Sequence, residues 1–112
     1  MTALNKVEFL VLETAADPKC GLFEIVWTLN VQQPDWEPIV RVERAKAAVQ
    51  TLIEKGYVEL HRGHWDREEE LGMYPIEELP EIVRDPYVWQ RPDQGWYVII
   101  KLTPAGKAAW YK

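Results

Sequence analysis

The clearest hydrophobic pattern in the chain lies in residues 39–60, which read IVRVERAKAAVQTLIEKGYVEL. Apolar residues recur there every three or four positions, which places them on one side of a helix with charged residues on the other. These apolar residues are Val42, Ala45, Val49 and Leu52. Gly56 follows them, and glycine best tolerates the left-handed conformation that often ends a helix. The pattern predicts an amphipathic helix that ends at residue 55.

Two later segments change from helical spacing to alternation. Residues 57–62 alternate with period two directly after the predicted helix, and residues 96–103 alternate with apolar side chains on both faces. Each segment predicts a strand. Thr103 and Pro104 then combine a helix N-cap with a proline at the first helical position, which predicts a short final helix that reaches Trp110.

Two further helices are expected before this unit. The spacing predicts the first within residues 1–17 and the second over residues 22–30, followed by a proline-containing loop over residues 31–38. Between the two strands lies a long connection, residues 63–95, which we call the insert. Its apolar spacing predicts a short helix over residues 75–84.

The bulk properties fit one soluble domain. A chain of 112 residues can bury one real core, so we expect residues 1–112 to form a single domain. No apolar run approaches the length that crosses a bilayer, and the N-terminal residues lack the features of a secretory signal. We therefore expect a cytoplasmic protein that does not bind membranes.

Charge is unevenly distributed along this acidic chain, whose net charge is −5. Residues 39–62 carry five bases and three acids, whereas the insert carries nine acids and three bases. The helix and first strand therefore form a positive region, while the insert would repel phosphate.

Candidate catalytic and metal-binding residues are few. The chain has no serine, and Cys20 is its only cysteine, which fits a small packed residue rather than a nucleophile. His61, His64, Asp66 and Glu69 could ligate a metal, but the histidines are three residues apart at a strand end, and a solvated turn explains the cluster more simply. We expect no enzymatic activity, no metal and no cofactor.

Two motifs resemble those of the winged helix-turn-helix superfamily. AVQTLIEKGYVEL at residues 48–60 resembles the end of the recognition helix and the first wing strand of bacterial regulators, and LTPAGKAA at residues 102–109 is similar to the second wing strand and the helix after it. Arg-Gly-His-Trp at residues 62–65, with a Trp-containing second helix, resembles small uncharacterised bacterial winged-helix proteins. The resemblance implies an α+β fold of three helices, a two-stranded antiparallel wing and a C-terminal helix. The long acidic insert between the wing strands departs from these regulators, whose wing is usually a short basic hairpin.

DNA binding is the function that this resemblance implies. A recognition helix would present its polar side to the major groove, where arginine suits guanine and glutamine suits adenine. The expected nucleic-acid-binding residues are Arg41, Arg44, Lys46, Gln50 and Arg62. The alternative is that they are ordinary solvated residues, since Glu43, Ala47 and Ala48 leave this side poor in base-reading groups.

A protein-interaction module is the competing interpretation. Six tryptophans and five tyrosines are more than one small core needs to hide, and several fall in the insert. The expected interaction residues are Trp65, Tyr74, Tyr87 and Trp89. If the insert lies beside Arg41 and Arg44, its acids favour a protein partner, and if it lies on the far side, DNA binding survives. A homodimer through the first or last helix would serve either function.

Overall fold

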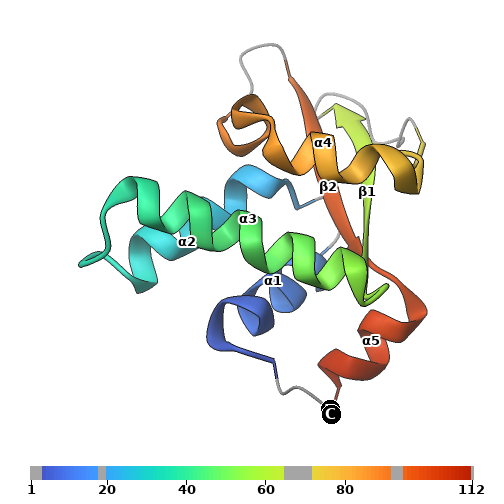
Figure 1. Cartoon of the computed structure of the whole chain (residues 1–112), viewed down its shortest axis with the longest axis horizontal. Helices are drawn as coiled ribbons and strands as arrows, with labels where there is room; N and C mark the ends of the chain where they lie inside the picture. The colour runs from blue at the N-terminus through green and yellow to red at the C-terminus, as the bar shows by residue number, and fades with distance from the viewer. Residues whose placement is uncertain (1–3, 18–19, 65–71, 92–94, 112) are drawn as a thin grey trace.

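The computed structural model describes residues 4–17, 20–64, 72–91 and 95–111. This part of the chain is α+β, with five α-helices and one two-stranded antiparallel sheet (Figure 1). The elements in chain order are α1 (Lys6–Ala16), α2 (Leu22–Gln32), α3 (Pro38–Glu54), β1 (Val58–His64), the 3-10 turn η1 (Ile76–Glu78), α4 (Leu79–Arg84), the 3-10 turn η2 (Pro86–Trp89), β2 (Trp96–Leu102) and α5 (Pro104–Trp110). The three helices, two strands and final helix expected from the sequence are all present.

The ends of the helices follow local chemistry. Asn5 and Glu8 form a reciprocal capping box at the start of α1, in which each side chain accepts a hydrogen bond from the other residue's backbone N–H. The predicted end of α3 is confirmed, because Lys55 is its C-cap and Gly56 has a φ of 73°. That turn lets the chain enter β1 at Val58, two residues after Gly56.

The three N-terminal helices pack together through the expected apolar faces. Their buried side chains join those of the sheet, α4 and η2 in one core. The largest fully buried side chains are Val11, Leu12, Leu22, Ile25, Leu29, Val49, Leu52, Leu60, Ile99 and Ile100. The predicted inner face of α3 is confirmed for Ala45, Val49 and Leu52, whereas Val42 is only partly buried and Ala48 is also buried.

Both edges of the sheet carry an additional short segment. The strands pair antiparallel, with Val58 opposite Leu102 and Arg62 opposite Val98. Gly21 forms a bridge with Ile99 on the free edge of β2, and the Ile100 N–H donates to the Cys20 carbonyl oxygen at 3.0 Å. Residues 72–74 flank the free edge of β1 in the same way, since the Tyr74 N–H donates to Leu60 and the Arg62 N–H donates to Gly72, both at 2.9 Å. These additions were not predicted from the sequence.

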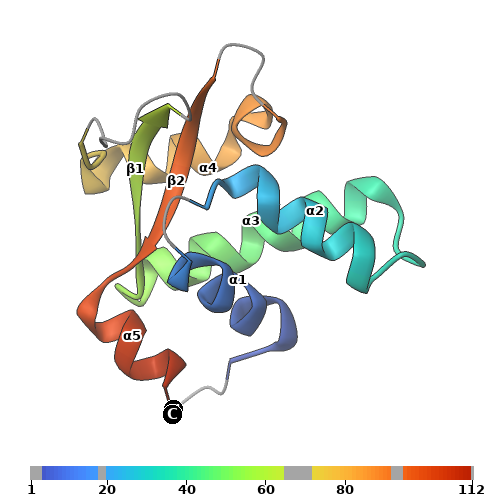
Figure 2. The ribbon, with the colours of Figure 1, turned by 180° about the vertical axis from the view of Figure 1, so that it is seen from behind.

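The described part of the insert folds back over the domain. Figures 1 and 2, seen from opposite sides, place α4 on one face of the sheet and leave the strands in front on the other side. α4 also packs against α3, and η2 packs against α2. The predicted helix over residues 75–84 is therefore present as η1 followed by α4.

The last helix is held against the turn between α3 and β1. The Thr103 hydroxyl accepts a hydrogen bond from the Gly106 N–H at 3.0 Å, which confirms the predicted N-cap. Gly106 lies directly against the carbonyl of Tyr57, where a Cβ would overlap the oxygen atom. α5 can approach this closely only because residue 106 has no side chain.

Candidate functional site

Arg41, the first expected DNA-contacting residue, is bound within the protein. Its Nε donates to the Gln33 carbonyl oxygen at 3.0 Å, Nη1 donates to Asn30 Oδ1 at 2.7 Å, and Nη2 donates to the Pro34 carbonyl oxygen at 3.1 Å. These bonds fasten the start of α3 to the end of α2 and the loop between them. The guanidinium therefore stabilises the conformation of this loop, and it could contact a DNA base only after these hydrogen bonds break.

The other polar residues expected on α3 also have contacts inside the chain. The Arg44 guanidinium carbon lies 4.9 Å from the centre of the Trp36 ring. Lys46 Nζ lies 3.8 Å from Glu43 Oε1, and Gln50 Nε2 donates a 3.4 Å hydrogen bond to Glu54 Oε1 on the next turn of the helix. Surface contacts of this kind are weak. They do, however, engage every side chain on which base reading by α3 was expected to depend.

The insert covers part of the same helix. α4 packs along the C-terminal half of α3, where Lys46 and Gln50 share a groove with Pro80 and Arg84. The described part of the insert thus contacts the C-terminal half of α3 rather than the Arg41 end of the helix. This placement differs from both positions considered from the sequence. The uncovered N-terminal half of α3 exposes Ile39 by 67% and Val40 by 36%. An exposed surface of this kind is apolar and suits a nucleic acid poorly.

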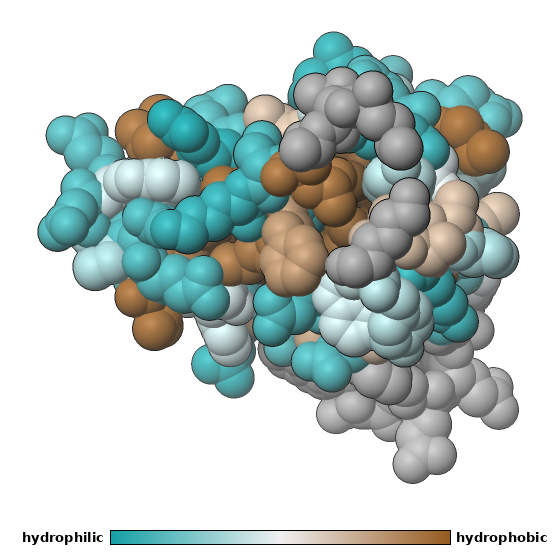
Figure 3. Space-filling view, turned by 90° about the horizontal axis from the view of Figure 1, so that it is seen from below, coloured by the Kyte–Doolittle hydropathy of each residue, from teal (hydrophilic) through white to brown (hydrophobic). Residues whose placement is uncertain are grey.

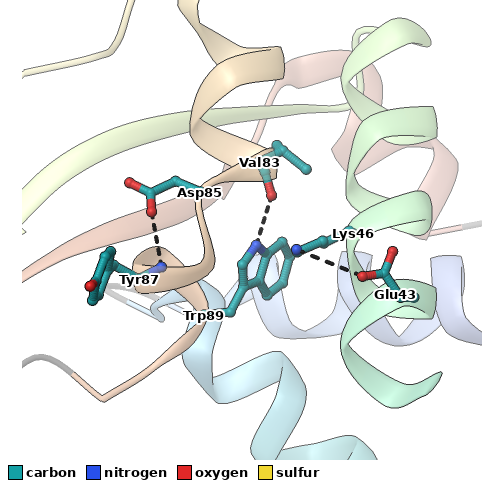
Figure 4. Close-up of polar contacts among 6 residues, drawn as sticks. All are labelled: Glu43, Lys46, Val83, Asp85, Tyr87 and Trp89. Carbon is teal, nitrogen blue, oxygen red and sulfur yellow. Dashed lines mark hydrogen bonds and ion pairs between the residues drawn. The ribbon is translucent and has the colours of Figure 1, made fainter. Parts of the chain in front are cut away.

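Trp89 was expected to contact a partner, but the structure buries its side chain in the core. Only 5% of its surface is exposed, and its indole Nε1 donates to the Val83 carbonyl oxygen at 2.8 Å. Figure 4 shows Trp89 pointing from η2 toward α3, whereas Tyr87 points to the opposite side. Tyr87 is 77% exposed. The indole needs both an apolar site and a hydrogen-bond acceptor, and the end of α4 supplies both.

Arg62 has the most distinctive surroundings of the expected residues. It lies on β1 diagonally across the sheet from Trp96, and its guanidinium carbon is 4.6 Å from the centre of the Trp96 ring. His64 stands directly opposite Trp96 and meets the same ring edge to face at 4.6 Å. Among the described residues, no carboxylate forms an ion pair with Arg62. The Trp96 ring therefore holds at the surface a guanidinium that no carboxylate within the described ranges pairs with.

Arg62, Tyr74 and Tyr87 come together with Trp96 around a recess of about 300 Å³. We call this site the aromatic recess. It is lined by Arg62, Tyr74, Tyr87, Val88, Gln90, Trp96, Tyr97 and Val98. Burial raises the pKa of Tyr74, while the positive charge of Arg62 opposes that rise more strongly than Glu78 adds to it. The phenol therefore stays protonated at neutral pH and can donate a hydrogen bond.

The recess was only partly predicted. Arg62 was assigned to nucleic acid and the two tyrosines to a protein surface, yet the structure places all three in one site. Trp96 was not selected, because the alternation of β2 identifies its face but not its neighbour across the sheet. Trp65 lies outside the described residues.

The described residues do not assemble a metal or nucleophile site. His61 and His64 lie on opposite faces of β1, as residues three apart on a strand must, and His61 Nε2 is 3.2 Å from Glu59 Oε1. No group of three or more potential ligands gathers among the described residues, and Asp66 and Glu69 lie outside them. Burial, together with nearby carboxylates, raises the pKa of Cys20 to about 12, so its thiol is poorly nucleophilic.

A second hollow lies between α1, the end of β2 and α5. It has a volume of about 560 Å³, and its lining includes Glu13, Asp17, Lys101 and Lys107. This mixture of charges favours no single class of ligand. Figure 3 views the molecule from below, the end where α1 and α5 lie, and shows hydrophobic side chains near the centre of that face with hydrophilic ones around them. Phe9 of α1 is 46% exposed. Self-association through α1 or α5 stays a prediction.

Comparisons with known protein families, with curated proteins and with solved structures found no match. No helix in the described ranges has both the length and the apolar character needed to span a bilayer. A function must therefore follow from the positions of the chain's own residues.

Proposed function

We propose that this chain is a domain of the winged helix-turn-helix type that binds a protein partner rather than DNA. The order of elements supports the first half of the proposal, because three packed helices lead directly into an antiparallel hairpin and a final helix. The bridge between Gly21 and β2 adds support, since it ties the α1–α2 connection to the edge of that hairpin.

The observation that carries the second half is the aromatic recess. Tryptophan, tyrosine and arginine are the residues that most often dominate the energy of protein interfaces. Arg62, Tyr74, Tyr87 and Trp96 reach the recess from four separate segments of the chain, and Tyr87 is 77% exposed. Exposed aromatic side chains such as Tyr87 and Trp96, grouped with an arginine, suit a protein surface.

The state of α3 argues against base reading. Its basic residues contact Asn30, Trp36 or Glu43, and α4 covers one side of its C-terminal half. A helix that entered the major groove would have to break these contacts and bring the apolar side chains of Ile39 and Val40 toward the bases.

A duplex titration separates the two functions. We expect the purified protein to show no salt-sensitive binding to random-sequence duplex DNA, because phosphate contacts would make the affinity fall steeply as salt rises. Salt-sensitive binding that Arg44→Ala and Gln50→Ala both weaken would overturn the proposal in favour of DNA recognition by α3.

The positive test compares two tyrosines of equal exposure. Tyr87 and Tyr111 are 77% and 76% exposed, but only Tyr87 lines the recess. We expect crosslinking in cell extract to recover a discrete partner with the wild type and with Tyr111→Ala, and to lose it with Tyr87→Ala. Equal recovery by both variants would show that the recess is not the binding surface.

A further inference from the structure

The side chains that line the aromatic recess indicate the chemistry of the group that it would bind. Its one cationic side chain is Arg62, whose guanidinium carbon lies 4.6 Å from the centre of the Trp96 ring. The contact with the ring leaves the N–H groups at the edge of the guanidinium as donors. No described carboxylate forms an ion pair with that edge. A planar, bidentate acceptor such as a carboxylate is the group that matches it.

The rest of the recess favours an aromatic or large apolar group. Val88 and Val98 provide aliphatic surface, while Tyr74, Tyr87 and Trp96 provide ring surface. A volume of about 300 Å³ is at the lower limit for small-molecule pockets, and it suits one or two side chains better than a larger ligand. Tyr74 and Gln90 add polar groups at the margin.

We propose that the recess recognises a peptide segment of the protein partner in which an acidic residue stands beside an aromatic one. The carboxylate would pair with Arg62 while the aromatic ring packs between Tyr87 and Trp96. This inference rests on the proposed function, since it specifies the partner that the domain would bind. Charge complementarity favours an acidic segment even though the domain as a whole is acidic, because Arg62 is the charged side chain in the lining of the recess.

A dipeptide series tests the two requirements separately. The probes are N-acetyl-aspartyl-phenylalanine amide, its asparaginyl counterpart, and N-acetyl-aspartyl-alanine amide. Binding is followed through the indole N–H signal of Trp96 in a ¹⁵N-labelled protein, with that signal assigned from Trp96→Phe. We expect the aspartyl-phenylalanine peptide to bind about fivefold more tightly than its asparaginyl counterpart, the advantage of one partly exposed ionic hydrogen bond. The alanine peptide should bind more weakly than either.

Matched variants make the result specific to Arg62. Arg62→Gln should bind the aspartyl and asparaginyl peptides equally, whereas Arg84→Gln, which alters an exposed arginine on α4, should keep the wild-type preference. Far-UV circular dichroism confirms that each variant is folded. Equal binding of the two peptides by the wild type, or an unchanged preference in Arg62→Gln, would overturn the inference.

Two outcomes distinguish this inference from the proposed function. Phenylacetate is the small-molecule probe, and if it binds as tightly as the aspartyl-phenylalanine peptide, the recess is a site for free aromatic acids and the peptide assignment is overturned. If a partner is captured through Tyr87 but the recess shows no preference for a carboxylate, the proposed function stands and only this inference fails.

Discussion

Replacing Trp89 tests whether the insert is part of the core or an appendage to it. The indole lies between η2 and α3, and its Nε1 donates to the Val83 carbonyl oxygen at 2.8 Å (Figure 4). Val83 is in the last turn of α4, where the final carbonyls of a helix have no partner further along it. The side chain thus fills space between the insert and α3 and also closes the end of α4.

The two contributions predict different losses of stability. Trp89→Phe keeps most of the apolar volume but leaves the Val83 carbonyl without its donor, which costs about 1–3 kcal/mol of unfolding free energy. Trp89→Ala also opens a cavity among buried residues, so the loss should reach about 3–5 kcal/mol. Domains of this size have roughly 5–15 kcal/mol in total, so the second change should remove a large fraction of the stability.

Urea unfolding measures both values, and Tyr87 provides the control. Circular dichroism at 222 nm reports the helices, and an unchanged slope with denaturant would indicate that the unfolded state is unaltered. Tyr87→Phe, two residues away on the exposed side of η2, should change stability by less than about 0.5 kcal/mol. A similarly small loss in Trp89→Ala would refute the reasoning, because it would mean that the insert contributes nothing to the core.

Three other predictions concern single residues. Leu52 is fully buried on α3, so Leu52→Ala should cost about 2–5 kcal/mol in the same urea assay, and a loss below about 0.5 kcal/mol would mean that its face is misassigned. Gly106→Ala places a methyl group against the Tyr57 carbonyl oxygen, so it should reduce the free energy of unfolding by about 1–3 kcal/mol and lower the melting temperature. An unchanged melting temperature would contradict the close packing of α5. Burial raises the pKa of Cys20 to about 12, so alkylation by iodoacetamide at pH 8 should be much slower in the folded than in the urea-unfolded protein, and equal rates would show that the thiol is not shielded. Because the folded state favours the protonated thiol, this group's contribution to stability is fully present at neutral pH and declines as pH rises above its ordinary pKa of about 9 toward the folded value of about 12.

Local sequence signals predicted the helical part of the fold well. The spacing of Ala45, Val49 and Leu52, the glycine at position 56 and the Thr103 cap all act within a few residues of the chain, and each appears where it was expected. Their physical causes are periodicity, a positive φ and a single hydrogen bond, so they can be read without knowing the tertiary structure.

The candidate site could not be predicted in the same way, because it is formed by contacts between residues far apart in the sequence. Trp89 and Tyr87 are two residues apart in one short turn, yet one is buried and the other is exposed, because η2 lies between α2 and solvent. To predict the contact between Arg62 and Trp96, one would need the register of two strands that are separated in sequence by the whole insert. A sequence pattern gives the face of a strand, but the partner across the sheet is set by long-range packing.

The segments that flank both edges of the sheet limit how another polypeptide can bind. Exposed strand edges offer rows of unpaired N–H and C=O groups that invite a foreign strand, either in a specific complex or in an aggregate. Here Gly21 occupies part of the β2 edge, and Met73 occupies part of the β1 edge. Extension of the sheet by an incoming strand would first have to displace one of these segments. In the proposed complex, a partner would therefore be recognised by its side chains rather than by its backbone. The same two segments hinder the edge-to-edge polymerisation to which a bare two-stranded hairpin is prone.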